Sequence, residues 1–166
     1  NSRMLDFFEC NNITIEGYGA TMRMNKNEYT SGEGRHALVI EGSNNVAIRG
    51  LTIRDSGGDG IYIGSGVQGY SRNITVEDVL STNNRRQGMS IISAQDVYVR
   101  NSTFENSNGT LPETGVDLEI KTSTDEKILA SYGIFNTPAI IVAEYKLKTQ
   151  GEVPDVEIIK EWIKDI

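Results

Sequence analysis

Four side chains that could take part in acid–base chemistry each stand a few residues before a short apolar segment. They are His36, Asp59, Arg86 and Glu113. If the segments stack as parallel strands, equivalent positions lie beside each other and these four side chains share one edge of the stack. We therefore take them as the catalytic candidates.

Two reactions on a chain of sugar acids would use such a row. A lyase needs a base, here His36 or Arg86, to remove the proton beside a uronate carboxylate, and a cation to neutralise the enolate. A hydrolase needs two carboxylates roughly 5–9.5 Å apart. Asp59 and Glu113 lie two repeats apart, and strand spacing converts that separation to about 10 Å.

Neighbouring side chains supply candidate contacts to a bound ligand: Tyr62, Arg85, Arg86, Gln87 and Asp117. The guanidinium of Arg matches the geometry of a carboxylate, and Tyr offers an apolar face with a polar tip. The alternative is that the whole row is solvated and only satisfies the backbone of the turns. The residues leave both interpretations open, and they show no cage of oxygen ligands for calcium or another metal.

The strands that would position this row come from an internal repeat. One series of segments begins at Asn12, Asn45, Asn73 and Asp96. The second series, 37–40, 60–63, 88–91 and 115–118, lies between them, and a weaker third follows at 51–53, 79–81 and 102–104. All have a period of two without helix signals, which predicts an all-β solenoid of about four coils. Unequal coil lengths place insertions in one loop, notably 21–34 and 64–71.

Alternation along these strands predicts which apolar side chains point into the column. They are Ile13, Ile15, Val46, Ile48, Ile61, Ile63, Ile74, Val76, Met89, Ile91, Val97, Val99, Val116 and Leu118.

Residues 10–119 resemble the right-handed parallel β-helix proteins of the pectate lyase and polygalacturonase class. The segments Asp59-Gly60-Ile61-Tyr62-Ile63-Gly64 and Asn84-Arg85-Arg86-Gln87-Gly88-Met89-Ser90-Ile91 carry the resemblance as consecutive coils. It implies the fold, and it places the chain beside proteins that are typically secreted or periplasmic. It implies less about activity, because this fold carries lyases, hydrolases, adhesins and phage spikes.

The composition changes near residue 120. Residues 1–119 hold 13 Asn, 15 Gly, nine Arg and one Lys, whereas residues 120–166 hold one Asn, two Gly, six Lys and no Arg. We therefore expect two parts of different origin, 1–119 and 120–166, joined within 115–120. The net charge of −7 argues against nucleic acid as a partner, and no apolar run is long enough to cross a membrane.

The second part has helix signals at 125–132 and 156–165 and strand signals at 139–143 and 145–149. Its segments 134–142 and 151–157 resemble the second half of a small thioredoxin-like redox protein, in a β-α-β-β-α order. The resemblance implies that Thr137-Pro138 is the cis-proline turn of that fold. A dithiol cycle needs two nearby thiols. The chain has one cysteine, Cys10, so we do not expect an oxidoreductase, and no cofactor is implied.

These parts suggest a designed or recombined chimera, in which the thioredoxin-like half caps the open end of the β-helix and nothing is turned over. The alternatives are a polyuronide lyase or glycoside hydrolase, or a surface that binds acidic polysaccharide without catalysis. The opposite end, residues 1–9, has no evident cap helix and is a candidate surface for a homodimer. No signal peptide is recognisable, so the localisation stays open.

Overall fold

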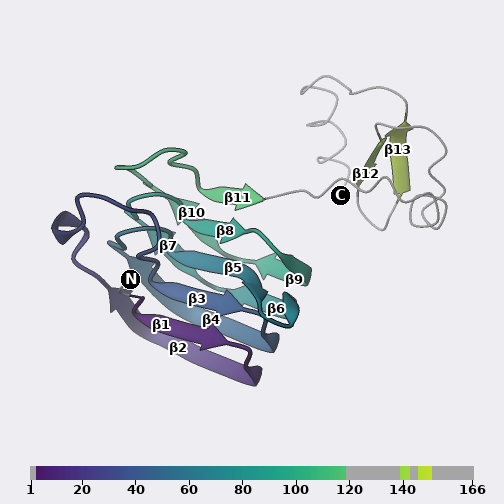
Figure 1. Cartoon of the computed structure of the whole chain (residues 1–166), viewed down its shortest axis with the longest axis horizontal. Helices are drawn as coiled ribbons and strands as arrows, with labels where there is room; N and C mark the ends of the chain where they lie inside the picture. The colour runs from purple at the N-terminus through teal and green to yellow at the C-terminus, as the bar shows by residue number, and fades with distance from the viewer. Residues whose placement is uncertain (1–2, 119–138, 143–145, 151–166) are drawn as a thin grey trace. The chain divides into compact units, whose positions relative to one another are not determined.

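The structure, a computed structural model, describes residues 3–118, 139–142 and 146–150. The chain divides into two compact units, 1–120 and 121–166. Among its described residues, the first unit holds eleven strands, β1 to β11, which belong to one continuous sheet wound on itself. Figure 1 shows these strands in two stacked rows, coloured from purple to green along the chain. The first unit is called the column below.

The first face of the column is a row of parallel strands, each hydrogen-bonded to the next. In spatial order they are β1 (Leu5–Phe8), β3 (Leu38–Glu41), β5 (Ile61–Gly66), β8 (Met89–Ile91) and β11 (Val116–Leu118). The register aligns Leu38 with Ile61, and Met89 pairs with both Ile61 and Val116. The strands β3, β5, β8 and β11 are the second series of the sequence repeat, and β1 adds a strand that the repeat did not predict.

The second face contains the other two series. Its strands are β2 (Asn11–Arg23), β4 (Asn44–Arg54), β6 (Gly69–Glu77), β7 (Leu80–Thr82), β9 (Ala94–Arg100) and β10 (Thr103–Glu105). In β4 the first and third series form one strand. The second half of β2, residues 20–23, pairs with residues 51–54 in the same way, although the repeat predicted no third-series segment there. The register stacks Val46 between Ile13 and Ile74, as the alternating pattern predicts.

The core lies between the two faces and follows the predicted alternation through the middle coils. Ile48, Ile61, Ile63 and Ile74 have no exposed surface. Burying each such side chain stabilises the fold by about 1.5–3 kcal/mol. The prediction fails at the last coil: Val99, Val116 and Leu118 are 41%, 45% and 56% exposed. These residues belong to β9 and β11, which each pair with one strand only among the described residues.

A ladder of side chains explains why each first-series segment begins with Asn or Asp. Asn12, Asn45, Asn73 and Asp96 all have φ between 52° and 60°, the left-handed region that Asn and Asp tolerate best. Asn45 Nδ2 donates to Asn12 Oδ1 at 3.0 Å, and Asn73 Nδ2 donates to Asn45 Oδ1 at 2.7 Å. The asparagines therefore turn the chain and join successive coils.

The two insertions lie at different corners of the column, which corrects the expectation of a single loop. Residues 64–71 form an antiparallel hairpin between β5 and β6, in which Ser65 pairs with Tyr70. Residues 24–36 leave the end of β2 and include a short 3₁₀ turn, η1 (Lys26–Glu28). This second segment returns to the first face just before β3. It packs against the turn that precedes β5, where a Cβ at Gly57 would meet Tyr29 and one at Gly58 would meet the carbonyl of Glu33.

In the second unit the structure describes two strands, β12 (Ala139–Val142) and β13 (Lys146–Gln150). They match the predicted strands closely and pair with each other in an antiparallel sheet. The predicted helices at 125–132 and 156–165, and the turn at Thr137-Pro138, lie outside the described residues. Within the described ranges, no helix has the length and apolar character needed to span a membrane.

Candidate functional site

The predicted row of polar residues lies on the outer side of the first face. Tyr62, Ser90 and Asp117 occupy the same register position in β5, β8 and β11. His36 and Asp59 stand in the turns before β3 and β5, as the repeat predicts. The structure thus brings His36, Asp59, Arg86, Gln87 and Asp117 into one network that includes Ser90 and extends to Tyr62.

Asp59 is the centre of this network and has no exposed surface. Ser90 Oγ lies 2.8 Å from Asp59 Oδ2, and Arg86 Nη1 lies 3.5 Å from both carboxyl oxygens. Burial raises the pKa of Asp59 to about 6, although the bonds from Ser90 and Arg86 oppose that shift. The carboxyl is therefore a weakly paired acid held away from water.

The ring nitrogen of His36 that faces Asp59, Nδ1, already accepts a hydrogen bond. The backbone N–H of Asp59 donates to His36 Nδ1 at 3.0 Å. Burial, with the charges of Arg3 and Arg86, lowers the pKa of His36 to about 4, so the ring is neutral at pH 7 and carries its proton on Nε2. Neither nitrogen then has a free lone pair, which removes the basis for His36 as the base of a lyase.

The ring of Tyr62 packs against the ring of His36. The rings of His36 and Tyr62 stack with centroids 4.7 Å apart and planes inclined by 18°. Tyr62 is half-buried, whereas His36 is buried. The stacking holds the tyrosine ring in a fixed orientation.

Gln87 links the network to the last coil. Its Oε1 accepts from Arg86 Nη1 at 2.7 Å and lies 2.6 Å from Ser90 Oγ, while its Nε2 donates to Asp117 Oδ2 at 2.6 Å. Gln87 is completely buried. The prediction that Gln87 contacts a ligand therefore does not fit this structure, in which its amide groups bind neighbouring side chains.

Glu113 and Arg85 do not join this network. Glu113 Oε1 accepts from the backbone N–H of Gly109 at 2.7 Å and so fixes the loop in which both lie. Arg85 Nη2 donates to the carbonyl of Thr30 at 3.4 Å, on the insertion. A hydrolase would need both Asp59 and Glu113 to reach the substrate, and Asp59 is completely buried.

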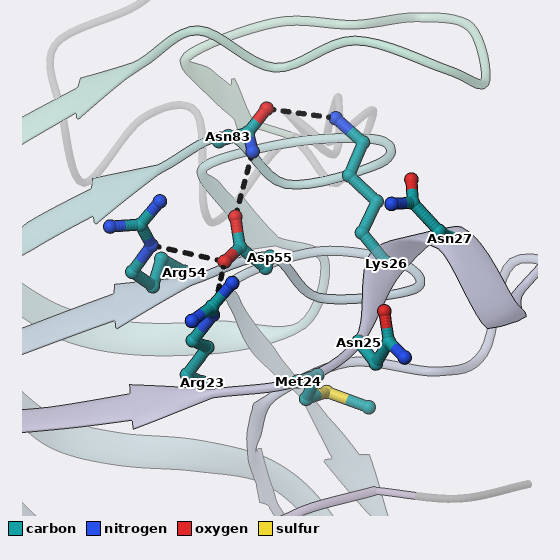
Figure 2. A pocket seen from close by; sticks show the side chains of 8 residues that line it. All are labelled: Arg23, Met24, Asn25, Lys26, Asn27, Arg54, Asp55 and Asn83. Carbon is teal, nitrogen blue, oxygen red and sulfur yellow. Dashed lines mark hydrogen bonds and ion pairs between the residues drawn. The ribbon is translucent and has the colours of Figure 1, made fainter.

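A second polar site, which the sequence did not predict, lies where the strands of the second face end. Figure 2 shows Arg23 and Arg54 converging on Asp55 from one side, and Lys26 reaching Asn83 from η1. Arg23 Nε and Arg54 Nε donate to Asp55 Oδ2 at 2.8 and 3.1 Å. Asn83 Nδ2 donates to Asp55 Oδ1 at 2.7 Å. These residues line a pocket of about 150 Å³, called the arginine pocket below.

The arginine pocket is built by the stacking of coils. Arg23 and Arg54 are register partners in β2 and β4. Asp55 and Asn83 follow the strands β4 and β7 with φ of 60° and 53°, so they form a second ladder like that of the asparagines. The signal was present in the sequence, because a polar residue follows the third series as regularly as one precedes the first. The insertion that contributes Lys26 has no such periodicity.

The described residues contain no cluster of three or more His, Cys, Asp or Glu side chains with the geometry to hold a metal ion. Cys10 is partly buried and free.

Comparison with known protein families now assigns both parts of the chain. Residues 11–131 match the model of the right-handed β-helix region. The chain belongs to the right-handed β-helix family. In this β-helix chain, residues 100–164 also match the thioredoxin domain model, so the two matches overlap at 100–131 and both include β11. No solved structure gives a significant match.

The thioredoxin match has a named relative. A 64-residue stretch of the β-helix chain, 39% of its length, is 36% identical to a thioredoxin of Methanocaldococcus jannaschii and covers 72% of that protein. This degree of identity and coverage places the C-terminal part of the chain in the thioredoxin family.

Proposed function

We propose that this chain is a structural scaffold that joins β-helix coils to the second half of a thioredoxin and has no catalytic turnover. The observation that carries the proposal is the complete burial of Asp59. A general acid or nucleophile has to reach a substrate atom at hydrogen-bond distance. Asp59 instead bonds to Ser90 and Arg86, and the histidine beside it has no free lone pair.

The junction supports a recombined origin. Strand β11 pairs in register with β8 and so completes the first face of the column. The same strand lies inside the thioredoxin match. A single strand that serves both families is the place where two sheets could be joined without an extra linker. The open edge of β11 would pair with other chains if it were left unprotected.

An assay for products tests the absence of turnover. The full chain would be incubated with polygalacturonate, alginate and a heparin-type polymer, while unsaturated uronates are followed by ultraviolet absorbance and new reducing ends by colorimetry. We expect no signal above a heat-denatured sample. Any activity of the full chain would overturn the proposal, and its disappearance in Asp59→Asn would assign it to the network, because this change removes the buried carboxyl and keeps its shape.

A second candidate function is the binding of acidic polysaccharide to the outer row without catalysis. The stack of Tyr62 on His36 favours this function, because an aromatic ring can contact the apolar face of a sugar. Arg86, whose side chain is 19% exposed, would bind the carboxylate. Calorimetric titration with a uronate trimer would test this function in the wild type and in Arg86→Gln. Equal heats for the two proteins would exclude the outer row as the binding surface.

A further inference from the structure

One asparagine of the column is followed by a residue that makes its side chain chemically reactive. Of the 14 asparagines in the chain, Asn108 alone precedes a glycine. The backbone nitrogen of a glycine can approach the side-chain carbonyl carbon of a preceding asparagine closely, because glycine has no Cβ to obstruct the approach. Attack by that nitrogen closes a five-membered succinimide ring. Asn108 and Gly109 are both exposed, so water reaches the place where the ring would form.

The loop after β10 holds the backbone of this pair and leaves the asparagine side chain free. The N–H of Asn108 donates to the carbonyl of Asn84 at 2.9 Å, and the N–H of Thr110 donates to the carbonyl of Arg85 at 2.8 Å. Between them, Gly109 has a φ of 137°, which residues with a Cβ rarely adopt. Within the described part of the chain, the side-chain amide of Asn108 has no hydrogen-bond partner. The amide can therefore rotate onto a backbone that is already positioned.

A carboxylate lies where the attacking nitrogen has to release its proton. The N–H of Gly109 donates to Oε1 of Glu113 at 2.7 Å, which is within the distance at which a general base removes a proton. Glu113 is itself exposed, so it can exchange that proton with water. An unfolded chain has the same Asn-Gly pair but no base held against the nitrogen. The fold therefore adds a catalytic group to a reactive sequence.

We propose that Asn108 and Gly109 form a self-modification site, at which the chain converts its own asparagine to aspartate and isoaspartate. The nitrogen of Gly109 forms a bond to the side-chain carbonyl carbon of Asn108, while its proton moves to Glu113. The bond from that carbon to the amide nitrogen then breaks, and the nitrogen takes the proton back from Glu113 and leaves as ammonia. Water opens the ring at either of its two carbonyls, which gives aspartate or isoaspartate. Nothing is oxidised or reduced, and water is the only co-reactant.

The modification would place a new carboxylate among cations. Asn108 and Lys26 line the same groove, which has a volume of about 520 Å³. The loop also packs on Arg85, since a Cβ at Gly109 would lie 2.9 Å from Arg85 Cγ. The buried Nε of Arg85 has no hydrogen-bond partner among the described residues. Both cations would attract the product carboxylate, so we expect the modified chain to stay folded. A single self-modification is not turnover, so this inference is independent of the scaffold proposal.

The test is peptide mapping by mass spectrometry of the full chain during storage in mildly alkaline buffer, with methylation by an isoaspartate-specific methyltransferase as a second readout. Asn101 and Asn106 are internal controls, because both are exposed and each precedes a serine. Glu113→Gln keeps an oxygen that can accept the N–H but cannot take its proton, and Asn108→Gln prevents closure of a five-membered ring. Each protein is also stored in urea, where the contact between Glu113 and Gly109 is lost. The comparison with the internal controls needs no variant, so it holds whether or not the variants fold.

We expect Asn108 of the folded wild type to be modified at least about tenfold faster than Asn101 or Asn106. Loss of the base in Glu113→Gln should slow the reaction at Asn108 by about tenfold in buffer and leave its rate in urea unchanged. Asn108→Gln should give no methylation from this loop. Equal rates at Asn108 and the internal controls would overturn the proposal. An equal rate in Glu113→Gln and wild type in buffer, or an equal slowing in urea, would overturn the role of Glu113 as the base.

Discussion

The Nδ1 atom of His36 accepts the backbone N–H of Asp59 at 3.0 Å and lies 3.3 Å from the carboxyl oxygen Oδ2 of the same residue. Two acceptors at that distance repel each other unless a proton lies near them. The pKa of Asp59 is raised to about 6, and that of His36 is lowered to about 4, in both cases mainly by burial. The folded state therefore favours a neutral His36 beside a neutral Asp59 over an ion pair between the two.

The stability of the fold should depend on pH in opposite directions for these two groups. The folded state binds the Asp59 proton more tightly than the unfolded chain, so this group costs stability as pH rises from 3.8 to about 6. The folded state disfavours the His36 proton, so this group costs stability as pH falls from 6.5 to about 4. Each effect amounts to at most about 3 kcal/mol, and in the wild type they largely cancel.

Single variants should separate the two effects. Between pH 4 and 6, Asp59→Asn should gain stability relative to the wild type by up to about 3 kcal/mol, because one ionisation is removed. His36→Gln should gain relative to the wild type as pH falls across the same range. Urea unfolding at each pH measures both, and other carboxyls contribute equally to all three proteins. Parallel pH profiles for the wild type and Asp59→Asn would contradict the raised pKa.

The asparagine ladder should carry a measurable part of the stability. Asn45→Ala places a Cβ residue without a compensating side chain at φ 57°, and it removes the amide that bonds to both Asn12 and Asn73. Strain and lost bonds together predict a loss of about 2–4 kcal/mol. Asn45→Gly loses the same side-chain bonds but accepts the backbone angle, so it should cost less in thermal or urea unfolding. A larger loss in the glycine variant would show that strain is not the cause.

A methyl group added at Gly60 should destabilise the fold far more than a substitution at an exposed residue does. Its Cβ would lie 2.1 Å from Ser81 Oγ, 2.6 Å from Asn84 Nδ2 and 2.7 Å from the carbonyl of Gly88. These atoms belong to the next coil and bond to each other, so they cannot withdraw independently. We expect Gly60→Ala to lose about 3 kcal/mol or more, measured by urea unfolding. Val67→Ala, at a residue 87% exposed, is the control and should change stability by less than about 0.5 kcal/mol.

The N-terminal end of the column should associate with a second copy. Among the described strands, β1 pairs with β3 alone and β2 with β4 alone, which leaves the 13-residue β2 with one unpaired edge. Long open edges are templates for pairing. Size-exclusion chromatography with light scattering should show a dimer. Thr14→Lys on β2 should shift it to the monomer by like-charge repulsion, whereas a monomeric wild type at high concentration would remove the prediction.

The repeat predicted the strands and most of the core because a period of two determines which face each side chain takes. Ile13, Val46 and Ile74 stack in register for that reason. The pattern does not determine what covers an outward position. Ser90 points away from the core and is nevertheless fully buried, and its Oγ lies within hydrogen-bond distance of Asp59 and Gln87 in the turns of two coils. Contacts between side chains of irregular turns were not readable from periodicity.

The arginine pocket was missed for a related reason. Arg23 and Arg54 are 31 positions apart and meet only through the register of β2 with β4. Lys26 then approaches from a turn whose direction no local pattern fixes. In contrast, the change of composition near residue 120 was visible without any structure. Both expected families were found, although their matches, 11–131 and 100–164, overlap across residue 120.

The hairpin between β5 and β6 lies within a span of 28 residues that separates Asn45 from Asn73, and yet these two asparagines still bond at 2.7 Å. The next coil covers the equivalent path, from Asn73 to Asp96, without a hairpin, and β6 and β9 remain in register. The corner before Asn73 thus accommodates extra residues while the rungs keep their order. A guest peptide grafted at Gln68, at the tip of this hairpin, would be displayed on a rigid frame without altering the stack beneath it.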